Sequence, residues 1–116
     1  MYRGCEVFLS TDVVTGDLVV RVIGEVDAAT VAVLEDALES VLPNESPVLV
    51  IDLANVDFMS AAGLRLLIDT NDRLRRAGRS LSLRHPSSGV SMVLRAAGVE
   101  HLFDIERRNG TQSPGR

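Results

Sequence analysis

The stretch Val48-Leu49-Val50-Ile51-Asp52-Leu53 is apolar at five of its six positions. A strand covered on both faces in a parallel sheet has such a nearly continuous apolar pattern, whereas a strand with one wet face alternates apolar and polar residues. The stretch therefore predicts a buried central strand of an α/β domain. Because an unpaired carboxylate would be costly in such a strand, we expect Asp52 to accept hydrogen bonds from nearby loops.

Helical patterns lie on both sides of this strand in the sequence. Before it, Asp27 is a candidate cap for a helix with charged residues on its outer face. The apolar face of this first helix carries Val31, Leu34, Leu38 and Val41. After the strand, a second helix is predicted to begin near Ser60 and to stop at Gly78. Its buried face carries Leu64, Leu67, Ile68, Asn71 and Leu74. A third helix contains Val90, Val93, Leu94 and Ala97 and ends at Gly98.

Shorter apolar segments supply the remaining strands. A first segment contains Val7, Leu9, Val13 and Val14. A turn at 15–17 separates it from the β-branched run 18–23, which predicts two antiparallel strands. Leu81 and Leu83 indicate a further strand, and residues 102–105 a possible last one. The chain is thus predicted to form a single α/β domain over residues 1–106, with a mostly parallel mixed sheet of four to five strands packed with α-helices. Residues 107–116 contain no apolar side chain and are predicted to be a disordered tail.

Three loops of this fold are expected to meet at one edge of the sheet. They are residues 24–27, 57–60 and 85–89, and each follows a predicted parallel strand. Function in open α/β sheets concentrates beyond the carboxyl ends of such strands. This edge is therefore the candidate site.

Composition excludes several kinds of chemistry. All twelve basic residues are arginine, so no lysine can form a Schiff base or a phosphate-binding P-loop. The net charge of -4 argues against nucleic acid as a partner, and the cluster Arg73, Arg75, Arg76 and Arg79 is interpreted as a solvated helix end whose cations complement the helix dipole. A lone cysteine and two unpaired histidines predict no metal site and no cofactor. No apolar segment is long enough to insert into a bilayer, and a cytoplasmic location is expected.

Catalysis is not expected either. Serine, histidine and aspartate residues occur in the three loops, but no Gly-x-Ser-x-Gly elbow accompanies them. Such residues at loop ends mostly cap helices, so the chain is predicted not to be an enzyme. What remains is a small rigid domain with a polar loop edge suited to binding a protein.

Three motifs indicate which kind of binding protein this is. The segment 56–65, Val-Asp-Phe-Met-Ser-Ala-Ala-Gly-Leu-Arg, resembles the signature of STAS domains, specifically of bacterial anti-sigma factor antagonists. The segment 24–30 resembles the second-strand exit of that family, and 48–53 resembles its central strand. The resemblance extends through His85-Pro86-Ser87 and residues 93–99 and covers nearly the whole chain up to about Glu106.

The resemblance implies a function in partner switching. Members of the family bind an anti-sigma factor, typically a serine kinase with a fold like that of histidine-kinase ATPase domains, and so release a sigma factor. The kinase phosphorylates the second residue of the run that here reads Ser60-Ala61-Ala62-Gly63. That residue is Ala61, which has no hydroxyl group. The alternatives are that Ser60 accepts the phosphate, that the antagonist is unregulated or controlled by other means, or that a serine has been replaced.

The candidate partner contacts are this run and residues expected close to it, of which Asp27 should lie beside Ser60 and Arg65 should point outward from the second helix. They are Asp27, Asp57, Ser60, Ala61, Ala62, Gly63 and Arg65. For Ser60 the simpler interpretation is a helix cap whose hydroxyl accepts a backbone N–H. Asp57 either contacts the partner or ends its strand, while Phe58 and Met59 are expected in the core. A STAS subunit of a lipid-transporting ABC system is the alternative function.

Overall fold

One mixed sheet of five strands organises the computed structural model, which describes residues 4–107. The strands lie in the order β1-β2-β3-β4-β5 and are Cys5–Thr11, Leu18–Val26, Val48–Met59, Ser80–Arg84 and Asp104–Glu106. β1 pairs antiparallel with β2, and the other neighbours pair in parallel. The predicted fold class is therefore confirmed, with its antiparallel edge strand and its last strand. The predicted tail lies outside the described residues except for Arg107.

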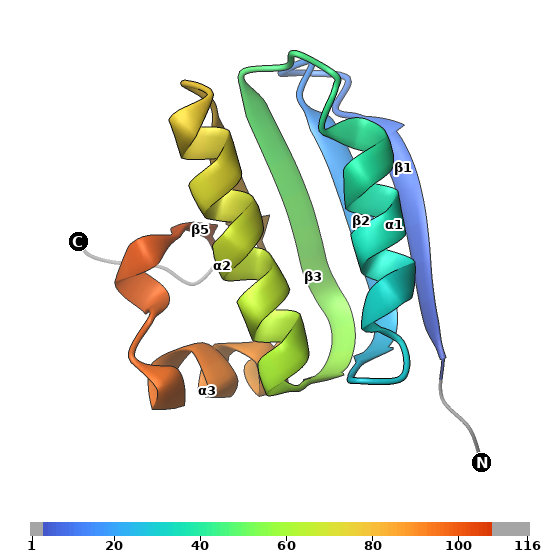
Figure 1. Cartoon of the computed structure of the whole chain (residues 1–116), viewed down its shortest axis with the longest axis vertical. Helices are drawn as coiled ribbons and strands as arrows, with labels where there is room; N and C mark the ends of the chain where they lie inside the picture. The colour runs from blue at the N-terminus through green and yellow to red at the C-terminus, as the bar shows by residue number, and fades with distance from the viewer. Residues whose placement is uncertain (1–3, 108–116) are drawn as a thin grey trace.

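The helices lie on one face of this sheet. They are Val31–Val41 (α1), Ala61–Arg76 (α2), Ser88–Ala97 (α3) and the short 3-10 helix Glu100–Leu102 (η1). α1 and α2 run along the strands, whereas α3 crosses near the start of α2 (Figure 1). Gly78 follows the C-cap of α2, and Gly98 is the C-cap of α3, so both helices stop where the sequence predicts.

The core lies between the sheet and the helices. Alternate residues of β3 face the helices, and Ile51 and Leu53 have no exposed surface. The predicted helix faces are buried, with two kinds of exception: Val31, Ile68 and Val93 are only partly covered, and Ala97 is exposed. Asp52 accepts a hydrogen bond from the N–H of Ala54 at 3.0 Å, two residues along its own strand. The prediction that the Asp52 carboxylate accepts hydrogen bonds from a loop was therefore wrong for this bond, whose donor lies in the same strand.

The β1–β2 turn differs from the prediction. β1 ends at Thr11, and Val13 and Val14 lie in the turn, 98% and 88% exposed. The N–H groups of Thr15 and Val14 donate to the carboxylate of Asp12, which Arg84 also contacts, and these interactions lower the pKa of Asp12. β-Branched residues favour strands, but here the hydrogen bonds of an aspartate turn determine the local conformation.

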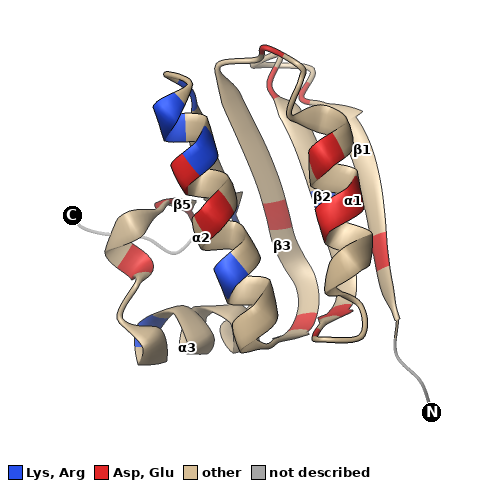
Figure 2. Ribbon diagram, viewed as in Figure 1, with Lys and Arg blue, Asp and Glu red and all other residues tan. Residues whose placement is uncertain are grey.

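The arginine cluster near the end of α2 has two different roles (Figure 2). Arg73 pairs with Glu39 of α1 at 2.6 Å, and Arg76 pairs with Asp72 one turn earlier. Arg79 lies beyond the helix and donates to two carbonyl oxygens, Leu42 O at 2.7 Å and Ser46 O at 2.9 Å. Leu42 is the C-cap of α1, so the predicted role at the end of α2 is wrong for Arg79.

Arg79→Met is expected to lower the free energy of unfolding by about 2 kcal/mol, because two carbonyls at the α1–β3 connection lose a charged donor. Arg75→Met is the matched control: Arg75 is exposed, and its replacement should change stability by less than about 0.5 kcal/mol. Urea denaturation of both variants measures the difference. Equal stability of the two variants would contradict the role given to Arg79.

Candidate functional site

The three predicted loops meet at one end of the sheet. The N–H of Ser60, at the end of β3, donates to Val26 O of β2 at 2.8 Å. From the β4–α3 connection, Ser87 Oγ donates to Val56 O at 2.6 Å, and the N–H of Ser87 donates to Leu53 O. The carboxyl ends of β2, β3 and β4 are thus joined by hydrogen bonds, as the parallel topology predicts.

β3 is longer than the sequence indicates. It continues to Met59, so Asp57 and Phe58 belong to the strand rather than to a loop. Met59 is 1% exposed and lies in the core as expected, but Phe58 is 48% exposed, and its expected core position was wrong. Near Gly24 the register between β2 and β3 shifts by one residue, since Gly24 pairs with Val56 and Glu25 pairs with Phe58. The alternation of buried and exposed residues is interrupted there, and the consecutive residues Asp57 and Phe58 are both exposed. Asp57 also interacts with another group of the protein.

Asp27 shapes the turn before α1. Its carboxylate accepts the N–H groups of Ala29 at 2.9 Å and Thr30 at 3.0 Å. The N-cap position of α1 is Thr30, so Asp27 caps the turn that leads into this helix, with its carbonyl oxygen accepting the N–H of Val31 at 2.8 Å. Thr30 Oγ1 accepts the N–H of Asp27 and lies 2.7 Å from Glu25 O. The role of this buried threonine was not predicted, although its position three residues after an aspartate is a recognisable turn signal.

Ser60 occupies the N-cap position of α2, but its hydroxyl does not cap the helix. The backbone oxygen of Ser60 accepts the N–H of Leu64 at 3.0 Å, while Oγ makes no hydrogen bond and is enclosed by neighbouring atoms. The expected hydroxyl cap was therefore wrong. The hydroxyl thus makes no bond with the N–H groups of the first turn, which the residue type alone does not reveal.

The first turn of α2 packs closely on the sheet at Gly63. A Cβ atom at this position would lie 2.8 Å from Cγ1 of Val26 and 2.9 Å from Cγ of Met59. Only a residue without a side chain allows this approach without movement of its neighbours. Because the side of α2 that carries Gly63 is buried against the sheet, the opposite side faces solvent. Ala61 is exposed there, and Ala62 is half-buried.

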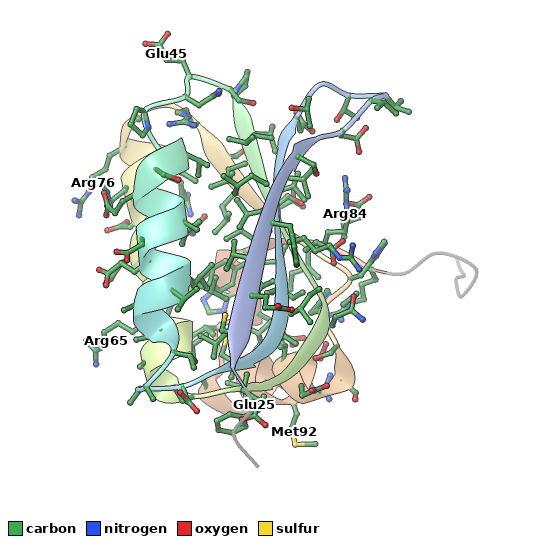
Figure 3. All side chains as sticks on the ribbon, turned by 90° about the vertical axis from the view of Figure 1, so that its right-hand side faces the viewer. Glu25, Glu45, Arg65, Arg76, Arg84 and Met92 are labelled. Carbon is green, nitrogen blue, oxygen red and sulfur yellow. The ribbon has the colours of Figure 1, made fainter. Side chains whose placement is uncertain are left out.

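The exposed side of α2 carries a shallow hollow of about 360 Å³ next to Ala61. Leu64 and Ile68 supply apolar surface, and Arg65 and Asp69 supply one charge of each sign. Arg65 points outward from α2, as predicted, and Glu25 and Met92 project at the same end of the molecule (Figure 3). Within residues 4–107, no group of three His, Cys, Asp or Glu side chains is arranged to hold a metal ion.

The fold and this end of the sheet define an α/β regulatory domain of the STAS class. A family model described as "Mlab, STAS domain" matches residues 10–104, and the chain belongs to this family. No helix within residues 4–107 combines the length and the hydropathy needed to cross a bilayer.

Three similar proteins are all named as anti-sigma factor antagonists. The anti-sigma-F factor antagonist RsfB of Mycobacterium tuberculosis is 37% identical over 59 residues, which are 51% of this chain and 48% of that protein. The chain therefore matches about half the length of that relative. The anti-sigma-B factor antagonist of Listeria monocytogenes is 29% identical over 96 residues, covering 83% of this chain and 84% of that protein. A solved anti-sigma factor antagonist from Mycobacterium paratuberculosis superposes with a TM-score of 0.81 at 26% identity, covering 90% of this chain and 87% of that one.

Proposed function

We propose that this protein is an anti-sigma factor antagonist, which binds an anti-sigma factor of the serine-kinase type in the cytoplasm and thereby releases a sigma factor. The names of its relatives support this function. The proposed action is binding, with no catalytic step. A STAS subunit of a lipid-transporting ABC system is not favoured, because these relatives are named as antagonists of anti-sigma factors.

The observation that carries the proposal is the exposed start of α2. Ala61 lies at the surface, next to a hollow with apolar walls and a charge of each sign. An apolar side chain of the partner would fill such a hollow, and Arg65 and Asp69 would contact polar groups around it. The exposed Phe58 and Met92 enlarge the apolar surface at this end of the molecule. Asp27 and Asp57 are the proposed acidic contacts.

Phosphorylation is the point at which this chain departs from its family. Ala61 has no hydroxyl, and Ser60 Oγ is enclosed, so a kinase would have to turn that side chain outward before reaching it. Both features support an antagonist that stays in the binding-competent state or is controlled by other means.

Displacement of a sigma factor tests the proposed function. The protein is titrated into a purified complex of a serine-kinase-type anti-sigma factor with its labelled sigma factor. Both of these proteins come from the organism that encodes the chain. We expect the labelled sigma factor to leave the complex, as measured by size-exclusion chromatography or fluorescence anisotropy. Failure to bind any anti-sigma factor of that organism would contradict the proposal.

A further inference from the structure

The outer edge of β1 pairs with no other strand among the described residues, because β1 ends the sheet on its side (Figure 1). This edge strand has seven residues, and the four from Phe8 to Thr11 are all exposed. Natural sheets protect such an edge with lysine, proline, a bulge or a very short strand. β1 contains no proline and no basic residue, and it pairs with β2 in an unbroken register. The edge is therefore available to another strand.

The same edge exposes apolar side chains on both faces of the sheet. Phe8 and Leu9 point to opposite faces and are each 50% exposed. On the helical face, Val33 of α1 is 45% exposed. Val33 lies on the flank of α1 opposite to Glu35 and Glu39, which line a hollow between α1 and α2, so Val33 faces the β1 side. A strand added here would cover apolar surface as well as backbone groups.

We propose that a second copy of this chain pairs with this edge, β1 against β1 and antiparallel, so that one sheet continues across two copies. The distribution of charge along β1 favours this occupant. Pairing centred on Phe8 places Glu6, the only charged residue of the strand, opposite the uncharged Ser10. Val7 then faces Leu9, and the two Phe8 rings meet at the two-fold axis. Both kinds of apolar cross-strand pair stabilise a sheet, whereas like charges directly opposite each other destabilise it.

This pairing goes beyond the proposed function and is compatible with it. β1 lies at the far side of β2 and α1 from α2 (Figure 1). Ala61 and the hollow beside it therefore remain accessible in the pair. Each copy could still bind its own anti-sigma factor.

Disulfide trapping tests the register. In a Cys5→Ala background, Phe8→Cys is expected to form an intermolecular disulfide rapidly on mild oxidation. Directly opposed residues of antiparallel strands have Cα atoms about 4.5–5.5 Å apart, which a disulfide can span. A mixture of Glu6→Cys and Ser10→Cys proteins of different mass should give the mixed dimer preferentially. Val13→Cys, at the exposed turn, measures random collision. Oxidation of Phe8→Cys no faster than that of Val13→Cys would overturn the proposal.

Sedimentation equilibrium tests the pairing in the unmodified chain. We expect a dimer whose dissociation constant rises about tenfold or more in Leu9→Lys, because each copy loses an apolar contact and gains a charge at the new strand pair. Ala96→Lys adds the same charge at an exposed position of α3 and should leave the constant unchanged. Circular dichroism verifies that both variants are folded. A chain that stays monomeric at millimolar concentration, or a dimer that Leu9→Lys does not weaken, would overturn the proposal.

Discussion

Ala61→Asp is expected to weaken binding of the anti-sigma factor by about a hundredfold or more. Ala61 is exposed at the rim of the hollow on α2, so an interface there would desolvate the new carboxylate, which costs more than its pairing with Arg65 one turn along the helix returns, with a net loss of about 3 kcal/mol or more. The fold itself should tolerate the change, since the first turn of a helix favours a negative charge. Isothermal titration calorimetry measures the binding, and thermal denaturation measures the stability.

Two further variants complete this experiment. Ala96→Asp adds the same charge at an exposed position of α3 and should bind like the parent protein. Ala61→Ser restores the hydroxyl at the usual acceptor position and should both bind and become phosphorylated by a serine-kinase partner with ATP. Equal binding by Ala61→Asp and the parent would show that this end of α2 does not contact the partner. A phosphopeptide that maps to Ser60 of the parent protein would contradict the proposal that this enclosed serine stays unmodified.

Periodicity and hydropathy were enough to predict the elements of this fold. The continuous run 48–53 indicates a buried central strand, and the spacing of Leu34 and Leu38 indicates a helix that covers it, although the helices cover only one face of the sheet. Both signals are local consequences of burial. The assignment of Val13 and Val14 failed because the side chain of Asp12 binds backbone N–H groups there, and that bond outweighs the strand preference of valine.

The site was predictable in its position and less so in its details. The edge at which the loops meet follows from topology, and the outward direction of Arg65 follows from helix periodicity. The exposed side chain of Phe58 and the enclosed hydroxyl of Ser60 depend instead on a register shift between β2 and β3 and on a single rotamer. Neither of these follows from the spacing of apolar residues.

The register shift is associated with Gly24, which has a φ of 110°. A Cβ atom there would lie 2.2 Å from Gly4 O, the oxygen that accepts the N–H of Glu25 at 3.1 Å. Two residues beyond Gly24, Val26 O accepts the N–H of Ser60. The backbone conformation of Gly24 therefore determines how the exit of β2 contacts both the start of β1 and the start of α2.

Gly24→Ala is accordingly expected to lower the free energy of unfolding by about 3 kcal/mol or more, since it adds a clash with backbone to the strain of a left-handed alanine. Gly16→Ala is the matched control, because Gly16 has a φ of 80° but no atom within 4 Å of its Cβ position. This control should lose only about 1–2 kcal/mol, the cost of the strain alone. Urea denaturation of both variants at one pH separates the two contributions. If Gly24→Ala were no less stable than Gly16→Ala, the start of β1 would have to yield easily, and the close contact with Gly4 could not be what holds the β2 exit beside α2.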